Sequence, residues 1–260
     1  MTDDLILTVD EKTDPLRVKI QRSIERLRAH EPQEGYYVAD SFGKDSCCIL
    51  ELCKMANVRF DSHHNLTTVD PPELIYFGKK HHPGTIIHKP EMNMFQLIVQ
   101  EGVPPTRFMR YCCKYLKESG GAGRLVVTGI RWAESIKRSK RRIIEACYKD
   151  KSKTFVNAII DWTTEDVWQF IRKYEIPYCN LYNEGFHRLG CIMCPMQGTR
   201  GQLSDAERWP KYKQAYLRAF DRMLQAHPDC TWKTAEEVYN WWIGVEQECT
   251  QDRLLPFEDQ

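Results

Sequence analysis

A short loop of mostly small residues, set between an apolar segment and a more helical one, constrains the fold of this chain most. Residues 35–39 (GYYVA) have the apolar character of a short buried strand, and residues 47–55 are apolar enough to form a helix. The loop between them, residues 41–46, has the sequence Ser-Phe-Gly-Lys-Asp-Ser. A strand, a small-residue loop and a helix in this order predict the start of a βαβ unit.

The alternation of strand and helix patterns continues along the chain. Further strands are expected at residues 65–69, 85–87 and 125–129, and further helices at residues 14–30, 73–81, 94–100 and from Thr163 onward. Beyond residue 200 the pattern is only helical, with helices expected at residues 206–227 and 235–242. These patterns predict an α/β fold with a twisted parallel sheet, helices on both of its faces, and a helical C-terminal extension.

The charge balance excludes some classes of function. Lys and Arg total 37 and Asp and Glu total 36, which leaves a net charge of +1. A uniformly basic coat for nucleic acid is therefore excluded, although a local basic patch is not. No apolar run reaches the roughly 20 residues that a membrane-spanning helix needs, and no signal-peptide pattern follows the acidic start. We expect a cytoplasmic protein that does not enter a membrane.

The loop at residues 41–46 has the composition of an anion site. Backbone N–H groups at the start of a helix point toward an anion, and the helix dipole favours negative charge there. Gly43 allows close approach of the backbone, Ser41 and Ser46 add hydroxyl groups, and Lys44 adds a cation. The alternative is a surface turn with a serine cap, since the loop lacks the Walker A pattern.

Four of the eleven cysteines form a pattern that indicates a metal site. They are the adjacent pair Cys112 and Cys113, and the CxxC pair Cys191 and Cys194. Four thiolates suit zinc or a 4Fe-4S cluster, and the divergence of two adjacent side chains favours the cluster. The alternative, in which cysteines serve as small buried hydrophobes, fits the remaining cysteines better than these four.

Two of these motifs resemble a known family. The loop is similar to the PP-loop, SxGxDS, of the adenine nucleotide α-hydrolase superfamily, which includes ATP pyrophosphatases and phosphoadenosine phosphosulfate (PAPS) reductases. The cysteine pattern resembles the 4Fe-4S signature of adenosine phosphosulfate (APS) reductases and of DNA phosphorothioation sulfurtransferases. The resemblance covers about residues 35–200 and implies a Rossmann-like PP-loop domain with a cluster site, between an N-terminal helix (residues 1–34) and a helical extension (residues 201–260).

The resemblance also implies roles for particular residues. It assigns adenine nucleotide binding to the PP-loop and to a TGIRWAESIKR segment that is similar to the family's TGxRxxES…R pattern. The implied nucleotide-binding residues are Ser41, Phe42, Gly43, Lys44, Asp45, Ser46, Asp70, Gly129, Arg131 and Arg138. Lys44 and Asp45 are the implied catalytic residues, with Asp45 organising the loop or a Mg²⁺ ion. The alternatives are a helix cap for Asp70 and a solvated charged face for the basic run at residues 131–142.

The C-terminal segment departs from the family. Reductases of the family carry a nucleophilic cysteine in an ECGxH-like motif, whereas Glu248 and Cys249 are followed here by neither Gly nor His.

These observations leave three hypotheses for the function. In the first, the chain uses ATP for sulfur transfer, with a cysteine-desulfurase-like sulfur donor and a nucleic acid among the possible acceptors. In the second, it is a PAPS or APS reductase in which Cys249 is catalytic and a thioredoxin-like protein supplies thiols. In the third, it is a noncatalytic sensing module. The helical extension could form a homodimer contact or cover the nucleotide.

Overall fold

The computed structural model describes residues 14–148 and 150–245, which form two compact units whose segments alternate along the chain. The first unit comprises the described residues up to Asn65, together with Pro72–His88 and Ser119–Leu189. The second comprises Leu66–Pro71, Lys89–Glu118 and the described residues from Gly190 onward. The sequence did not suggest this interleaving. The expected boundaries after residues 34 and 200 stay predictions.

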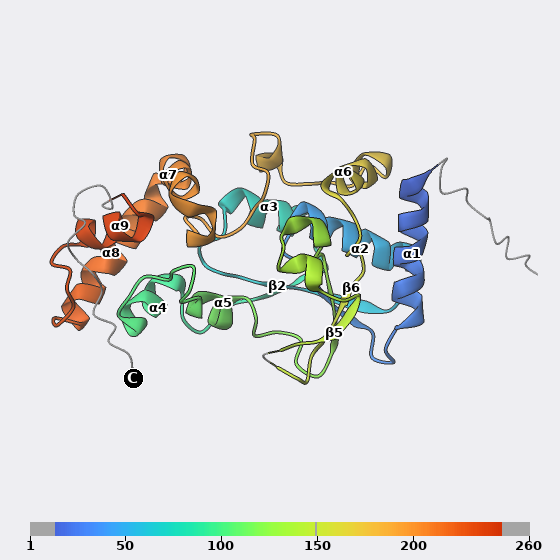
Figure 1. The fold of residues 1–260 in the computed structure, drawn as a ribbon, viewed down its shortest axis with the longest axis horizontal. Helices are drawn as coiled ribbons and strands as arrows, with labels where there is room; N and C mark the ends of the chain where they lie inside the picture. Colours follow the sequence, from blue (N-terminus) through green and yellow to red (C-terminus); the bar gives the residue numbers. More distant parts are fainter. Residues whose placement is uncertain (1–13, 149, 246–260) are drawn as a thin grey trace, which may run out of the picture. The chain divides into compact units, whose positions relative to one another are not determined.

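The first unit is built on a six-stranded sheet with the strand order β3-β2-β1-β4-β6-β5 (Figure 1). The strands are β1 (Tyr36–Ala39), β2 (Phe60–Asn65), β3 (Ile86–His88), β4 (Leu125–Thr128), β5 (Ile144–Ala146) and β6 (Thr154–Asn157). Neighbouring strands are parallel except for β5, which pairs antiparallel with β6 at one edge. The strand order reverses at β1, so the carboxyl ends of β1 and β4 flank the crevice where open α/β sheets bind ligands.

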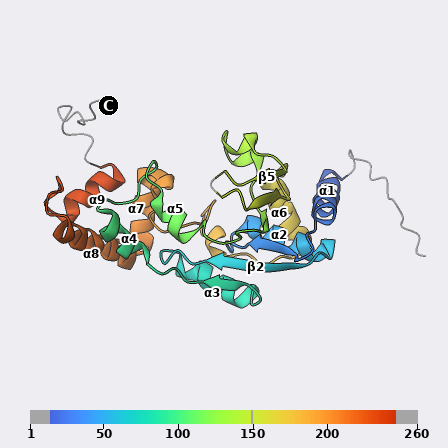
Figure 2. The ribbon, with the colours of Figure 1, turned by 90° about the horizontal axis from the view of Figure 1, so that it is seen from below.

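Helices of the first unit pack beside this sheet. They are α1 (Pro15–Ala29), α2 (Lys44–Ala56), α3 (Pro72–His81) and α6 (Thr164–Lys173). Helices α1, α2 and α6 contact one another (Figures 1 and 2), and α2 also contacts β1 and β4. Thr163 begins α6 with a capping box to Asp166. Three consecutive residues of β1, Tyr36 to Val38, are buried, so this central strand is covered on both faces.

The second unit is helical in its described residues. Its helices are α4 (Met94–Glu101), α5 (Tyr111–Leu116), α7 (Gly198–Arg208), α8 (Pro210–Ala226) and α9 (Ala235–Ile243). Helix α8 packs against α4 and α9. Its buried Tyr216 lies edge-on to Phe95 and 4.8 Å from the Trp242 ring, measured between centroids.

The expected fold class is confirmed: the protein is α/β with a mostly parallel sheet and a helical C-terminal region. Two expected elements are wrong in detail. The strand expected at residues 65–69 is β2 at Phe60–Asn65, whose polar sequence FDSHHN lacks an apolar strand pattern. The single helix expected at residues 206–227 is interrupted between α7 and α8. Pro210 begins α8 there, because proline lacks the N–H group that would continue α7.

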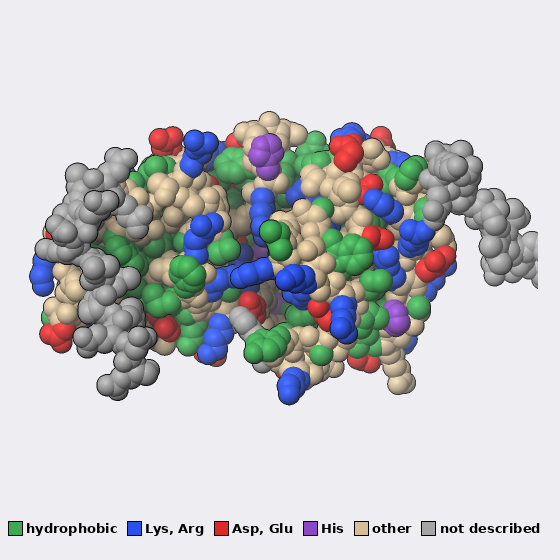
Figure 3. All heavy atoms as spheres, viewed as in Figure 1, with side chains coloured by type: hydrophobic (Ala, Val, Ile, Leu, Met, Phe, Trp, Pro, Cys, Tyr) green, Lys and Arg blue, Asp and Glu red, His purple; other side chains and the backbone are tan. Residues whose placement is uncertain are grey.

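Basic and acidic side chains are interspersed on the face drawn in Figure 3, in keeping with the near-zero net charge. In the part of the chain that the structure describes, no helix combines the length and apolar character needed to cross a membrane.

Candidate functional site

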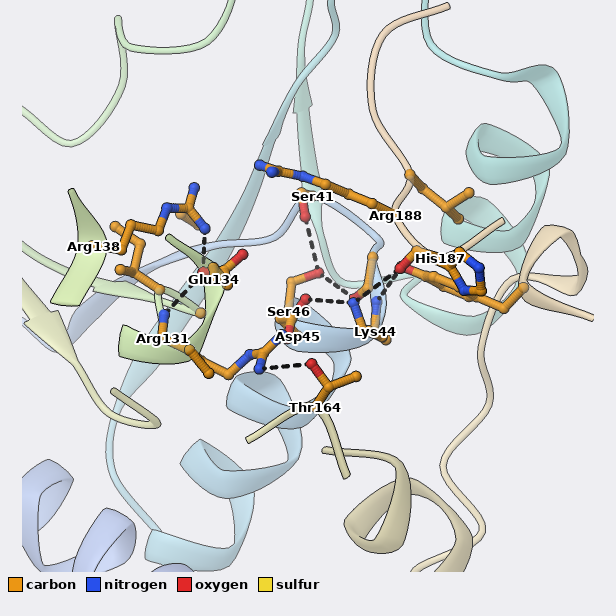
Figure 4. A pocket seen from close by; sticks show the side chains of 17 residues that line it. Ser41, Lys44, Asp45, Ser46, Arg131, Glu134, Arg138, Thr164, His187 and Arg188 are labelled. Atoms are coloured by element: carbon orange, nitrogen blue, oxygen red, sulfur yellow. Dashed lines mark hydrogen bonds and ion pairs between the residues drawn. The ribbon is translucent and has the colours of Figure 1, made fainter. Parts of the chain in front are cut away.

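A cavity of about 540 Å³ lies in the first unit, beyond the carboxyl ends of β1 and β4 (Figure 4). Its size is typical of small-molecule sites. Eight of the residues that the sequence predicted for nucleotide binding meet here from separate segments. They are Ser41, Gly43, Lys44, Asp45, Ser46, Gly129, Arg131 and Arg138. The sheet topology therefore brings the PP-loop and the segment after β4 together.

The loop enters the site through an unusual backbone conformation at Phe42. Its φ angle is 61°, in the left-handed region that bulky residues rarely adopt. Its backbone N–H donates to Asp40 Oδ1 at 2.9 Å. The Phe42 ring is fully buried and stacks on the His64 ring with a centroid distance of 4.1 Å. Phe42 does not line the cavity, although its two neighbours Ser41 and Gly43 do.

The start of α2 presents donors to the cavity. Gly43 is the N-cap residue and makes no side-chain cap bond. The first amides of a helix have no partner within the helix, which suits them to bind an anion. The Lys44 amide donates to the Tyr182 hydroxyl at 3.0 Å. Ser46 Oγ donates to the Gly43 carbonyl at 2.9 Å and lies 3.3 Å from Ser41 Oγ, so both serines stabilise the loop.

Two buried cations meet at one carboxylate inside the site. Arg131 Nε donates to Asp45 Oδ1 at 2.7 Å, and Lys44 Nζ lies 3.2 Å from Asp45 Oδ2. Arg131 and Lys44 are only 2% and 5% exposed. One carboxylate neutralises one of the two positive charges, so the group as a whole suits an anionic ligand. Because both Asp45 oxygens already have cationic partners, this geometry fits an Asp45 that organises the loop better than one that binds Mg²⁺.

The segment after β4 approaches the loop closely. A side chain at Gly129 would place its Cβ 3.0 Å from Asp45 Cβ and 3.1 Å from the Asp45 carbonyl carbon, so the glycine permits this contact. Glu134 accepts from the Arg131 amide at 2.9 Å and pairs with the Arg138 guanidinium. Arg138 is therefore held at the cavity by a carboxylate of its own segment.

Sequence reasoning missed several residues of the cavity. Tyr182, His187 and Arg188 precede the CxxC pair in the chain, and the structure places them in the lining of this cavity. The His187 carbonyl lies 3.5 Å from Lys44 Nζ, and the Arg188 side chain extends above Ser41 in Figure 4. They belong to a segment without a recognised motif, and their position next to the CxxC pair does not indicate a place in this cavity.

Besides Phe42, one further described residue that was predicted to bind the nucleotide, Asp70, does not line this cavity. Asp70 belongs to the second unit, where one carboxylate oxygen accepts from the Thr67 amide at 2.7 Å. Its role in nucleotide binding stays a prediction. Cys249 lies outside the described residues.

All four predicted metal ligands lie in the second unit. Cys112 and Cys113 belong to the short helix α5, and Cys191 and Cys194 belong to the turn that precedes α7. The turn is tight: the Cys194 amide donates to the Cys191 carbonyl at 3.2 Å. Asp205 of α7 accepts a hydrogen bond from the Met193 amide at 2.7 Å and so holds the turn against α7.

The four thiols share one electrostatic environment. A hydrogen bond from the Cys112 thiol is the largest of the causes that lower the pKa of the Cys113 thiol. The Arg110 guanidinium, whose Nη2 lies 3.2 Å from Cys113 Sγ, also lowers this pKa. The same thiol–thiol bond raises the pKa of Cys112. Burial and the charges of the other three cysteines raise this pKa as well. Cys191 in turn raises the pKa of Lys117. Even so, no three His, Cys, Asp or Glu side chains of the described residues are arranged to hold a metal ion.

Comparison with known proteins identifies related chains. The family model of the phosphoadenosine phosphosulfate reductase domain matches residues 35–197. An APS reductase of Oceanobacillus iheyensis is 30% identical over 66% of this chain and 75% of the relative. An APS reductase of Allochromatium vinosum is 30% identical over 45% of this chain and 50% of the relative. The chain thus spans about half the length of the second relative.

Two solved structures share the fold. The PAPS reductase of Candida auris, in a phosphate complex, has a TM-score of 0.51 at 17% identity and covers 70% of this chain and 97% of that one. The FMN adenylyltransferase of Candida glabrata, in complex with FMN and an ATP analogue, has a TM-score of 0.52 at 13% identity. The match covers 72% of this chain and 66% of that one. At these identities the likeness concerns the fold alone.

Arg131→Gln tests whether the buried guanidinium recognises the ligand. We expect it to weaken ATP binding about 10- to 100-fold, the loss typical of a hydrogen bond to a charged group. Isothermal titration calorimetry measures the affinity. Arg142→Gln is the matched control, because Arg142 is exposed and does not line the cavity. A folded Arg131→Gln protein that binds ATP as tightly as the control would contradict this assignment.

Proposed function

Because the chain belongs to the phosphoadenosine phosphosulfate reductase domain family, we propose that it is an enzyme that binds an adenine nucleotide in the cavity and uses it in sulfur chemistry. The observation that carries the proposal is the convergence of Lys44 and Arg131 on Asp45, at the uncapped start of α2. This arrangement supplies positive charge and helix amides at the place where a phosphate or sulfate group would bind.

ATP-dependent sulfur transfer is the reaction that we favour. The loop retains Lys44, Asp45 and Ser46, as the ATP-using members of the superfamily do. An acceptor oxygen would attack the α-phosphorus of ATP, and the bond to pyrophosphate would break. Sulfur delivered at the sulfide oxidation level would then bond to the activated acceptor atom, and AMP would leave with the former acceptor oxygen and the electron pair of the broken bond. Lys44 and Arg131 would stabilise the negative charge that develops on the phosphates. A sulfur-donor protein and an acceptor, such as a nucleic acid, complete this reaction.

Reduction of PAPS or APS is the second candidate, and the names of the curated relatives favour it. In this reaction the Cys249 thiolate would attack the sulfate sulfur, and the nucleotide would leave with the electron pair of the broken S–O bond. A thioredoxin-like dithiol would then release sulfite and become a disulfide. The same cavity would serve either reaction, because ATP, APS and PAPS all present an anionic group bonded to the 5′-phosphate of an adenosine.

The four thiols of the second unit are the residues that would hold a 4Fe-4S cluster. Their donor set fits such a cluster: all four are sulfur, and the cations of Arg110 and Lys117 offset the negative charge of thiolates. When bound, a cluster of this type supplies one-electron chemistry and an iron-bound sulfide pool. The chain's contribution is to fix the thiol positions, through α5 and through the bond from the Met193 amide to Asp205.

The products distinguish the two reactions. Anaerobically purified protein is incubated with ATP and Mg²⁺, and separately with PAPS or APS and a thiol reductant. We expect pyrophosphate from ATP in the presence of a sulfur donor and an acceptor extract, and no sulfite from PAPS or APS. Sulfite that disappears in Cys249→Ala would instead establish the reductase reaction. A protein that neither binds nor converts any of these nucleotides would refute the proposal as a whole.

Cys191→Ala tests the cluster assignment separately. After anaerobic reconstitution, we expect the wild-type protein to contain about four iron and four sulfide per chain, from the cluster stoichiometry, and Cys191→Ala to lose most of both. Cys230→Ala is the matched control, since Cys230 is a part-exposed cysteine of the same unit outside the pattern. Equal iron in Cys191→Ala and in the control would exclude Cys191 as a ligand.

A further inference from the structure

A buried polar network lies behind the nucleotide loop and is not used by the proposed chemistry. Its centre is Asp40, which follows β1 and is 2% exposed. Asp40 Oδ1 accepts from the Phe42 amide at 2.9 Å. Asp40 Oδ2 pairs with His82 Nδ1 at 2.6 Å and accepts from Thr85 Oγ1 at 2.9 Å. The carboxylate therefore links the loop backbone to the chain that follows α3.

The hydrogen bonds define which ring nitrogen of His82 carries a proton. Three groups, the Phe42 amide, His82 Nδ1 and Thr85 Oγ1, lie within hydrogen-bond distance of the two Asp40 oxygens, as suits a carboxylate. Burial raises the pKa of Asp40, but these bonds outweigh burial and lower the pKa overall. A carboxylate accepts hydrogen bonds, and His82 Nδ1 is therefore the donor. His82 Nε2 lies 3.7 Å from the buried Cys47 thiol of α2. Both ring nitrogens thus connect the loop to its surroundings inside the protein.

Phe42 needs such support, because its left-handed backbone is strained for a bulky residue. Its ring is enclosed on two sides. One face stacks on His64, with 10° between the ring planes, and α3 lies close enough that a Cβ at Gly78 would be 2.4 Å from the ring. Among the described residues, Asp40 is the only hydrogen-bond partner of the Phe42 backbone N–H group.

We propose that Asp40 and His82 are positioning residues of the nucleotide loop. They hold Phe42 in the left-handed conformation and thereby aim Gly43 and the first amides of α2 into the cavity. The proposal rests on the proposed nucleotide site, but Asp40, Phe42 and His82 do not line the cavity. Loss of the His82 donor leaves the buried Asp40 Oδ2 with Thr85 Oγ1 but without its shorter hydrogen bond. Weaker satisfaction of a buried carboxylate is costly, and we expect the Asp40–Phe42 support of the loop to loosen with it.

Two substitutions of His82 separate its donor from its bulk. In His82→Asn the amide nitrogen can replace Nδ1 as the donor to Asp40, whereas in His82→Leu no donor remains. We expect His82→Leu to weaken ATP binding about 10- to 100-fold and to accelerate amide hydrogen exchange in the peptide that spans residues 40–47. We expect His82→Asn to retain most of both properties. In turnover assays, we expect His82→Leu to lower kcat/KM and His82→Asn to retain most of it.

His63→Leu is the matched control. His63 lies in the same unit, is as buried as His82 (9% against 8%), and its ring bonds to Asp61 and His88 rather than to the loop or to the Asp40 carboxylate. Three results would overturn the inference: wild-type affinity and exchange in His82→Leu, equal losses in the Asn and Leu variants, or equal losses in His63→Leu. If the wild-type protein binds no ATP, APS or PAPS, the proposed function itself fails and this inference falls with it.

Discussion

The ion pairs of Asp45 are the interaction on which the candidate site depends. A carboxylate at the second residue of α2 pairs with the lysine beside it and with an arginine that lies 86 positions further along the chain. Because both cations are nearly buried, each would be costly to leave unpaired. The carboxylate therefore fixes the two cations at the start of α2. It does so without cancelling their combined charge, and this leaves a site that is positive, preorganised and suited to an anion.

The sheet topology explains why these residues meet. In a parallel sheet, the loops after β1 and β4 leave the same edge, and these two strands are neighbours although they are far apart in the chain. Gly129 then permits contact between the two loops, and the buried Asp40 network supports the first loop from behind. The four thiols belong to the other unit, together with the cations of Arg110 and Lys117.

The sequence predicted the parts of this account that depend on local pattern. The loop, its flanking strand and helix, and Arg131 and Arg138 were all expected in a nucleotide site, and the structure brings them together. Contacts made across the fold could not be predicted. Tyr182 and Arg188 approach the loop from a distant segment without a motif, and the polar strand β2 has no apolar alternation to reveal it. The division into two interleaved units also depends on such long-range contacts.

Hydrogen–deuterium exchange with and without ATP tests the central claim most directly, because it locates the ligand without requiring knowledge of the reaction. The account predicts that ATP slows exchange in the peptides that cover residues 41–47, 129–138 and 187–189, which surround the cavity. Saturating ATP that leaves these three segments unprotected, or that protects only peptides of the second unit, would contradict the assignment of the nucleotide site.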